Sequence, residues 1–85
     1  MGKTAFVTGG SRGIGRAVVR QLAAEGFAVG VGYLQARARA EELVEELTAG
    51  GMRAMAVQGD VADRAAITSA IRRVEDAFGA VTVLI

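Results

Sequence analysis

Glycine is concentrated in one short stretch near the start of the chain. Residues 8–15 read TGGSRGIG, after the apolar run 5–7 and before a stretch with helical periodicity. A tight turn from a strand into a helix points backbone N–H groups outward at the positive end of the helix dipole, which favours an anion. Glycine lets a phosphate approach the backbone and permits positive φ. We therefore predict that residues 8–15 bind a phosphate group.

Three phosphate-binding patterns compete for this stretch. A Walker A loop has the spacing of Gly10 and Gly15, but Arg16 and Ala17 stand where it needs Lys and Ser or Thr. The common dinucleotide fingerprint G-x-G-x-x-G/A, begun at Gly13, places Val18 at its third glycine position. The pattern T-G-x-x-x-G-x-G remains, and it is matched at Thr8, Gly9, Gly13 and Gly15.

The elements that position this loop alternate between strand and helix along the chain. Apolar runs predict strands at Lys3–Thr8, Phe27–Tyr33, Met52–Gln58 and Val81–Ile85. Helical periodicity predicts helices at Gly13–Glu25, at Arg37–Ala49 and from the cap Asp63 to Phe78. The residues expected to face inward are Ile14, Ala17, Val18, Leu22 and Ala24 in the first helix, Ala40, Leu43, Val44 and Leu47 in the second, and Ile67, Ala70, Ile71, Val74 and Phe78 in the third.

This alternation with short joints predicts an α/β fold with a parallel sheet. Right-handed crossovers give the strand order 3-2-1-4. The first two helices should cover one face of the sheet, and the third should cover the other face. The chain therefore contains three βα units followed by a fourth strand.

The composition excludes several classes of site. The chain has 85 residues, no cysteine, no histidine and a net charge of +1. Disulfides, thiol catalysis, histidine bases and zinc-thiolate sites are absent, and no metal site is predicted. The small net charge provides no strong attraction to nucleic acid or anionic lipid, and no apolar run approaches the ~20 residues of a membrane span. We expect one cytoplasmic domain that binds neither nucleic acid nor membrane.

The segment VTGGSRGIGRAV at residues 7–18 resembles the classical short-chain dehydrogenase/reductase family, and most of all its 3-oxoacyl-acyl-carrier-protein reductase branch. The resemblance covers the whole chain and implies the N-terminal half of a Rossmann domain over residues 1–85. A second family element, GDVAD at residues 59–63, resembles the segment that holds the adenine of the cofactor. The resemblance implies a hydrogen bond from the adenine amine to Asp60 and one from the amide of Val61 to a ring nitrogen. The loop residues that it assigns to the dinucleotide are Gly9, Ser11, Arg12, Gly13, Ile14 and Gly15.

The residues after the second strand indicate which nicotinamide cofactor is used. An NAD site places an acid about 20 residues beyond the loop, on the ribose 2′-OH, but residues 33–35 are Tyr-Leu-Gln. The resemblance to NADP-using members implies that Arg12 contacts the 2′-phosphate, so we expect NADP(H) to be preferred over NAD(H). Arg37 and Arg39 both stand in the first turn of the next helix, where a cation is unfavourable unless it serves a ligand. We expect Arg37, or else Arg39, to help neutralise the 2′-phosphate. The alternative is an exposed helix end with an Arg37–Glu41 ion pair.

Residues 1–85 do not contain the catalytic serine, tyrosine and lysine of the family in their expected pattern. In the family a tyrosine in Y-x-x-x-K donates the proton and a serine orients the substrate oxygen during hydride transfer to a carbonyl. The single tyrosine, Tyr33, is followed by Arg37 at that spacing, but it lies at the end of the second strand. We expect it to lie at the ribose of the adenosine, in stacking or packing, with its hydroxyl in water.

The chain alone is therefore expected to be inactive, as the cofactor-binding half of an enzyme that reduces a carbonyl substrate, which the resemblance suggests to be a 3-oxoacyl group. Two alternatives stay open: a nucleotide-binding module without chemistry, and a fragment that mainly self-associates. The last strand, VTVLI, has no charge and no proline and is predicted at the sheet edge, where it favours a homo-oligomer.

Overall fold

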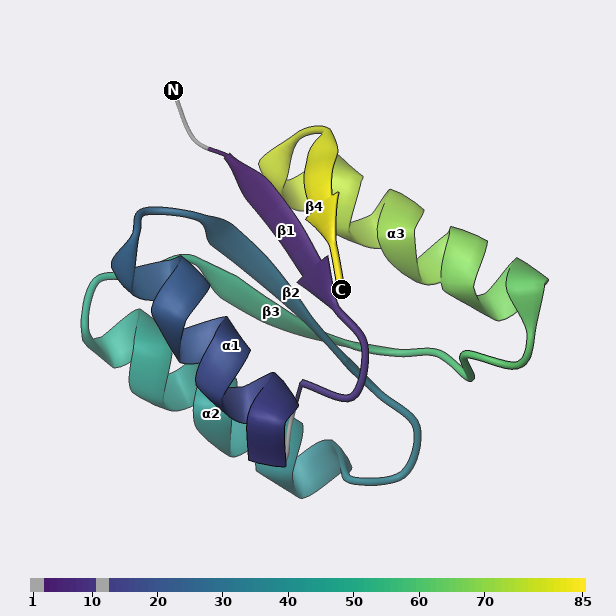
Figure 1. Ribbon diagram of the computed structural model, residues 1–85, viewed down its shortest axis with the longest axis horizontal. Helices are drawn as coiled ribbons and strands as arrows, with labels where there is room; N and C mark the ends of the chain where they lie inside the picture. The colour runs from purple at the N-terminus through teal and green to yellow at the C-terminus, as the bar shows by residue number, and fades with distance from the viewer. Residues whose placement is uncertain (1–2, 11–12) are drawn as a thin grey trace.

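The computed structural model describes residues 3–10 and 13–85. Its elements alternate between strand and helix along the chain (Figure 1). They are β1 (Thr4–Val7), α1 (Gly13–Ala24), β2 (Ala28–Tyr33), α2 (Arg37–Ala49), β3 (Ala54–Gln58), α3 (Arg64–Phe78) and β4 (Val81–Leu84). The predicted strands are longer than the observed ones by a residue or two at their ends.

The four strands form one parallel sheet in the order β3-β2-β1-β4, as the alternation predicted. Figure 1 shows α1 and α2 on one face of this sheet and α3 on the other. The strand β1 is buried along its whole length, because it has a strand on each side and helices over both faces. All of the strands run the same way, so their carboxyl ends and the loops that follow them meet at one edge of the sheet.

The core beneath α1 and α2 confirms the inward face predicted for α2 and corrects the one predicted for α1. Val19 and Ala23 are the buried residues of α1, while Val18 and Leu22 are only partly buried. Ile14 is exposed, as are Ala17 and Ala24. The prediction centred the apolar stripe on the largest side chains, but the helix is turned so that the smaller Val19 and Ala23 approach the sheet, which permits closer packing.

The core beneath α3 depends on two glycines of β2. Phe6, Ala70 and Val74 are buried there, and Ile67, Ile71 and Phe78 pack against them, as predicted. A Cβ on Gly30 would lie 2.5 Å from a methyl carbon of Val74, and one on Gly32 would lie 3.0 Å from the Phe6 ring. The sequence AVGVGY of β2 therefore places its large side chains toward α1 and α2 and leaves room for Phe6 on the other face.

Polar contacts fix both ends of α3. The predicted cap is confirmed: the Asp63 carboxylate accepts hydrogen bonds from the amides of Ala65 and Ala66 at 3.0 and 3.2 Å. At the other end, the Glu75 carboxylate accepts a hydrogen bond of 3.0 Å from the amide of Val81, where β4 begins. These contacts set where α3 begins and how the chain turns into β4.

Within residues 3–10 and 13–85, none of the helices has the length and apolar character needed to cross a bilayer.

An exposed ion pair joins α1 to α2. The Arg20 guanidinium donates two hydrogen bonds to the Glu46 carboxylate, at 2.9 and 3.0 Å, and Arg16 lies 3.9 Å from the same carboxylate. The hydrogen bond from Arg20 is the main reason why the pKa of Glu46 is lowered. The stabilisation from this pair is therefore complete above the unfolded-state pKa of a glutamate, about 4.3, and is lost as the pH falls through the lower folded-state value.

Replacing Glu46 with glutamine is expected to remove part of the acid sensitivity of the fold. Wild type should lose stability below about pH 4.3, and Glu46→Gln should lose less over the same range, because it has no carboxylate to protonate. Urea titrations at pH 7 and pH 3.5 measure the difference. Glu42→Gln, an exposed change on the same helix, is the control, and an equal response in both variants would contradict the role of the pair.

Candidate functional site

Hydrogen bonds between distant residues draw the loops together at the carboxyl edge of the sheet. The Thr8 amide and hydroxyl both donate to the carbonyl of Ile85, at 2.8 and 3.0 Å, which ties the end of β4 to the start of the glycine loop. The Gly10 amide donates to the carbonyl of Gly32 at 3.2 Å, and the Gly59 amide donates to that of Tyr33 at 2.9 Å. The segments after β1, β2 and β3 therefore surround one edge, the position where open parallel sheets bind ligands.

The glycine loop has the geometry that requires glycine. Gly9 and Gly13 have φ angles of 64° and 51°, which side chains rarely adopt. A Cβ on Gly15 would collide with the carbonyl oxygen of Gly9 and lie 3.1 Å from the Cα of Gly10. The first turn of α1 thus lies directly against the start of the loop, with no room for a side chain at residue 15.

Large apolar side chains are exposed at this edge and nowhere else in the described part of the chain. Their exposed fractions are 85% for Ile14, 49% for Leu34, 68% for Val61, 60% for Leu84 and 52% for Ile85. Each follows a strand, ends one, or stands in the first turn of α1. Exposed apolar side chains gathered beside a polar loop are typical of a ligand-binding surface.

Asp60 and Val61 stand in the turn between β3 and α3. One carboxylate oxygen of Asp60 accepts a hydrogen bond of 2.9 Å from the amide of Ala62, and its carbonyl accepts one of 2.9 Å from the amide of Asp63. These bonds hold the turn in shape, so Asp60 has the structural role of a helix-entry residue. Its second carboxylate oxygen is available for a ligand, and the adenine contacts expected of Asp60 and Val61 stay predictions.

Tyr33 is buried more deeply than the sequence analysis expected. Only 9% of its surface is exposed, and it belongs to the core between the sheet and the helices α1 and α2. Strand alternation turns its side chain to the same face as Val29 and Val31. Packing is therefore its structural role, and a contact with the ribose would involve only the rim of the side chain.

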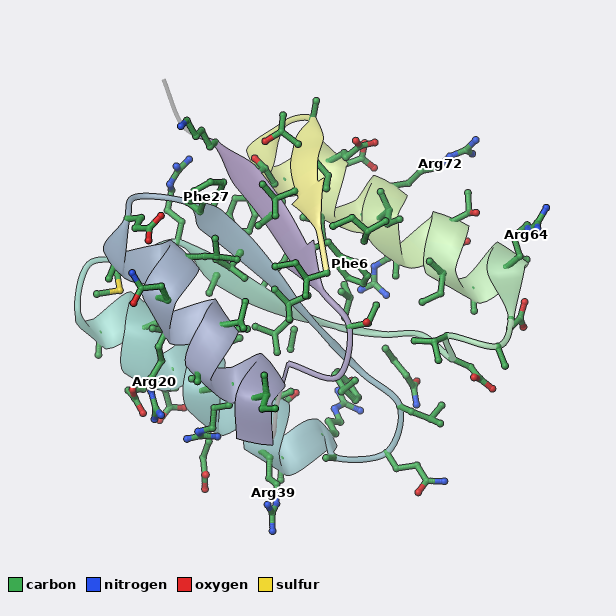
Figure 2. The ribbon with its side chains drawn as sticks, viewed as in Figure 1. Phe6, Arg20, Phe27, Arg39, Arg64 and Arg72 are labelled. Atoms are coloured by element: carbon green, nitrogen blue, oxygen red, sulfur yellow. The ribbon has the colours of Figure 1, made fainter. Side chains whose placement is uncertain are left out.

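The N-terminus of α2 has no acidic residue in its first turn, and no side chain caps it at Ala36. Arg37 donates a hydrogen bond of 3.1 Å to Glu41, the ion pair that the sequence analysis gave as the alternative to a ligand role. This hydrogen bond, with the charge of Glu41, raises the pKa of the Arg37 guanidinium. Arg39 points away from the body of the protein (Figure 2). The ion pair agrees with the alternative, and a contact of either arginine with a ligand stays a prediction.

Two of the predicted site residues, Ser11 and Arg12, lie outside the described residues. Among residues 3–10 and 13–85, no three Asp, Glu, His or Cys side chains gather as a metal ion would require.

One contact at the site was not predicted from the sequence: the Gln58 side chain donates a hydrogen bond of 3.1 Å to the carbonyl of Leu34. A glutamine at the end of a strand carries no signal of such a contact, because Leu34 is distant in the sequence.

The sequence pattern of the family described as short chain dehydrogenase matches residues 3–85. The chain belongs to this family. The glycine loop, the 3-2-1-4 sheet and the turn after β3 thus form the N-terminal part of a short-chain dehydrogenase, as the resemblance implied.

Three known proteins resemble the chain over nearly its whole length. The 3-oxoacyl-[acyl-carrier-protein] reductase FabG of Staphylococcus aureus is 45% identical over 85 residues, which are 100% of this chain and 35% of the relative. A dehydrogenase/reductase of Sinorhizobium meliloti superposes with a TM-score of 0.93 at 49% identity, over 98% of this chain and 33% of that one. A blue fluorescent protein from a metagenomic library, solved in complex with NADPH, gives 0.92 at 49% identity, over 98% and 34%. The chain therefore spans about a third of the length of these relatives.

Proposed function

We propose that the chain is the cofactor-binding part of an NADP(H)-dependent oxidoreductase that reduces a small carbonyl compound. The observation that carries this proposal is the close approach of Gly15 to the Gly9 carbonyl, which sets the N-terminus of α1 against the glycine loop at the carboxyl edge of the sheet. The name of the FabG relatives favours a 3-oxoacyl group as the substrate class. A cytoplasmic location is part of the same proposal.

The residues present fit a dinucleotide. The amides of the glycine loop suit its diphosphate, and the exposed side chains of Leu34 and Val61 suit the flat faces of an adenine. When bound, the nicotinamide would supply or accept the hydride. This chain's residues bind and orient the cofactor, and the chain on its own is proposed to be inactive, because Tyr33 is buried in the core and Lys3 stands at the opposite end of β1.

Preference for NADP(H) is proposed to come from Arg12, with Arg37 in support. Adenosine 2′,5′-bisphosphate and adenosine 5′-monophosphate probe this preference with the chain itself, because both carry only the adenosine half of the cofactor. A charge-assisted contact contributes about 1.5–3 kcal/mol. Arg12→Ala should therefore reduce the preference for the bisphosphate by about tenfold or more in calorimetric titrations.

Arg53→Ala is the matched control, because Arg53 is exposed and directly precedes β3, at the opposite edge of the sheet. It should leave both affinities unchanged. An Arg12→Ala chain with the wild-type preference would contradict the assignment and would point to Arg37 or Arg39. Failure of the wild-type chain to bind either compound would contradict the proposed function itself.

We also propose that the 85-residue chain self-associates through β4. Within the sheet β4 pairs with β1 alone. The amide and carbonyl of Ile85 both bond to the β1 segment, so strand alternation directs the backbone groups of Leu84 to the open edge. The segment 81–85 is uncharged, and Leu84 and Ile85 are exposed. Such an edge favours pairing with a second copy about a two-fold axis.

Leu84→Lys should weaken this dimer by about tenfold or more, because two ammonium groups would meet at the paired edges. Light scattering over a dilution series measures the dissociation constant. Leu84 is a sharper position than Val83, because Val83 is half buried while Leu84 is exposed. Leu34→Lys, at another exposed leucine, is the control. A wild-type chain that is monomeric at every concentration would contradict the proposal.

A further inference from the structure

The connection between β2 and α2 is held by two successive residues at the end of β3. It comprises only residues 34–36. The Gly59 amide donates to the Tyr33 carbonyl at 2.9 Å, and the Gln58 side-chain amide donates to the next carbonyl, that of Leu34, at 3.1 Å. Tyr33 and Gln58 form the last register pair of the two strands. The bond from Gln58 therefore extends the ladder by one residue into the loop, with a side chain in place of backbone.

The position of this loop controls what α2 presents at the carboxyl edge. Ala36 stands at the N-terminal cap of α2 and makes no side-chain capping bond, and Arg37 follows in the first turn. The buried residues Ala40, Leu43 and Leu47 hold the body of α2 on the sheet, so the loop before the helix acts on its first turn alone. A shift of Leu34 would move the first free amides of α2 and Arg37 together, because only two residues separate Leu34 from Arg37.

We propose that Gln58 is a positioning residue that sets how well the chain distinguishes adenine nucleotides with a 2′-phosphate from those without one. The inference rests on the proposed function, in which the end of β2 faces the adenosine ribose. Gln58 acts through the Leu34 carbonyl and does not touch the nucleotide. Its side chain is exposed, so replacing it leaves the core intact, and neutral glutamine donates a hydrogen bond without adding charge beside a phosphate.

Gln58→Met tests the proposal, because methionine has a similar length but cannot donate to the carbonyl. Titrations with adenosine 2′,5′-bisphosphate and with adenosine 5′-monophosphate should show the bisphosphate weakened by about three- to tenfold, the size expected for one lost hydrogen bond, and the monophosphate changed by less than about twofold. Amide hydrogen exchange at residues 35–37 should become faster in the variant without any nucleotide. Gln21→Met is the control: the Gln21 amide also donates to an acceptor, Glu25 at 2.7 Å, but on the exposed face of α1.

The outcomes separate this inference from the function on which it rests. Unchanged exchange at residues 35–37 in Gln58→Met would overturn the role of Gln58 whether or not nucleotides bind. Equal weakening of both nucleotides would also overturn it, because a general loosening of the fold does not select for the 2′-phosphate. A wild-type chain that binds neither nucleotide would overturn the proposed function, and the inference with it.

Discussion

Replacing Gly15 with alanine is expected to weaken nucleotide binding by about tenfold to a hundredfold and to destabilise the fold by about 1–3 kcal/mol. The new methyl carbon would collide with the carbonyl oxygen of Gly9, which is backbone and cannot rotate away. The first turn of α1 or the start of the loop must then move, and either movement misplaces the amides that face the phosphate.

Gly50→Ala is the matched control for this prediction. Gly50 has a φ of −85°, and its Cβ would meet nothing closer than the Leu47 carbonyl oxygen at 3.5 Å, an ordinary contact. Its alanine variant should keep the wild-type affinity and change stability by less than about 1 kcal/mol, in the stabilising direction. Calorimetric titration with adenosine 2′,5′-bisphosphate and urea denaturation give both quantities. If Gly15→Ala binds the bisphosphate as tightly as wild type, the result would contradict the argument on which the proposed function depends.

Replacing Gly30 with alanine is expected to cost about 1–3 kcal/mol of stability, because the added methyl carbon would lie 2.5 Å from one methyl carbon of Val74 and 3.1 Å from the Phe6 ring. Val74→Ala alone should also destabilise, since it opens a cavity in the buried core. The double variant should lose less stability than the sum of the two single losses, by about 1 kcal/mol or more. The methyl group added at residue 30 fills the space that Val74→Ala opens. Urea denaturation of the four chains measures this coupling.

Val19 supplies the control for the double-mutant cycle. It is as buried as Val74 but belongs to the core on the other face of the sheet. Gly30→Ala combined with Val19→Ala should therefore be additive within about 0.5 kcal/mol. An additive result for Gly30 and Val74 as well would show that the glycines of β2 do not make room for the α3 face.

Interpretation from the sequence was accurate where the pattern is local. Helical and strand periodicity extends over a few residues, so it predicted the elements, and their alternation with right-handed crossovers predicted the parallel sheet and its order. The cap at Asp63 was predicted for the same reason, because its partners, Ala65 and Ala66, lie two and three residues away. The glycine spacing in residues 8–15 likewise indicated the family, which the match over residues 3–85 shows.

Tertiary structure alone decided which side chains meet across the sheet and how each helix is turned. The rotation that buries Val19 in place of Ile14 follows from how closely α1 can approach the sheet, which depends on side chains of β1 and β2. The bonds from Thr8 to Ile85 and from Gln58 to Leu34 join residues 77 and 24 positions apart. Such contacts depend on strand register and loop length together, and neither leaves a periodic signal in the sequence, because register is set by packing between elements rather than within one.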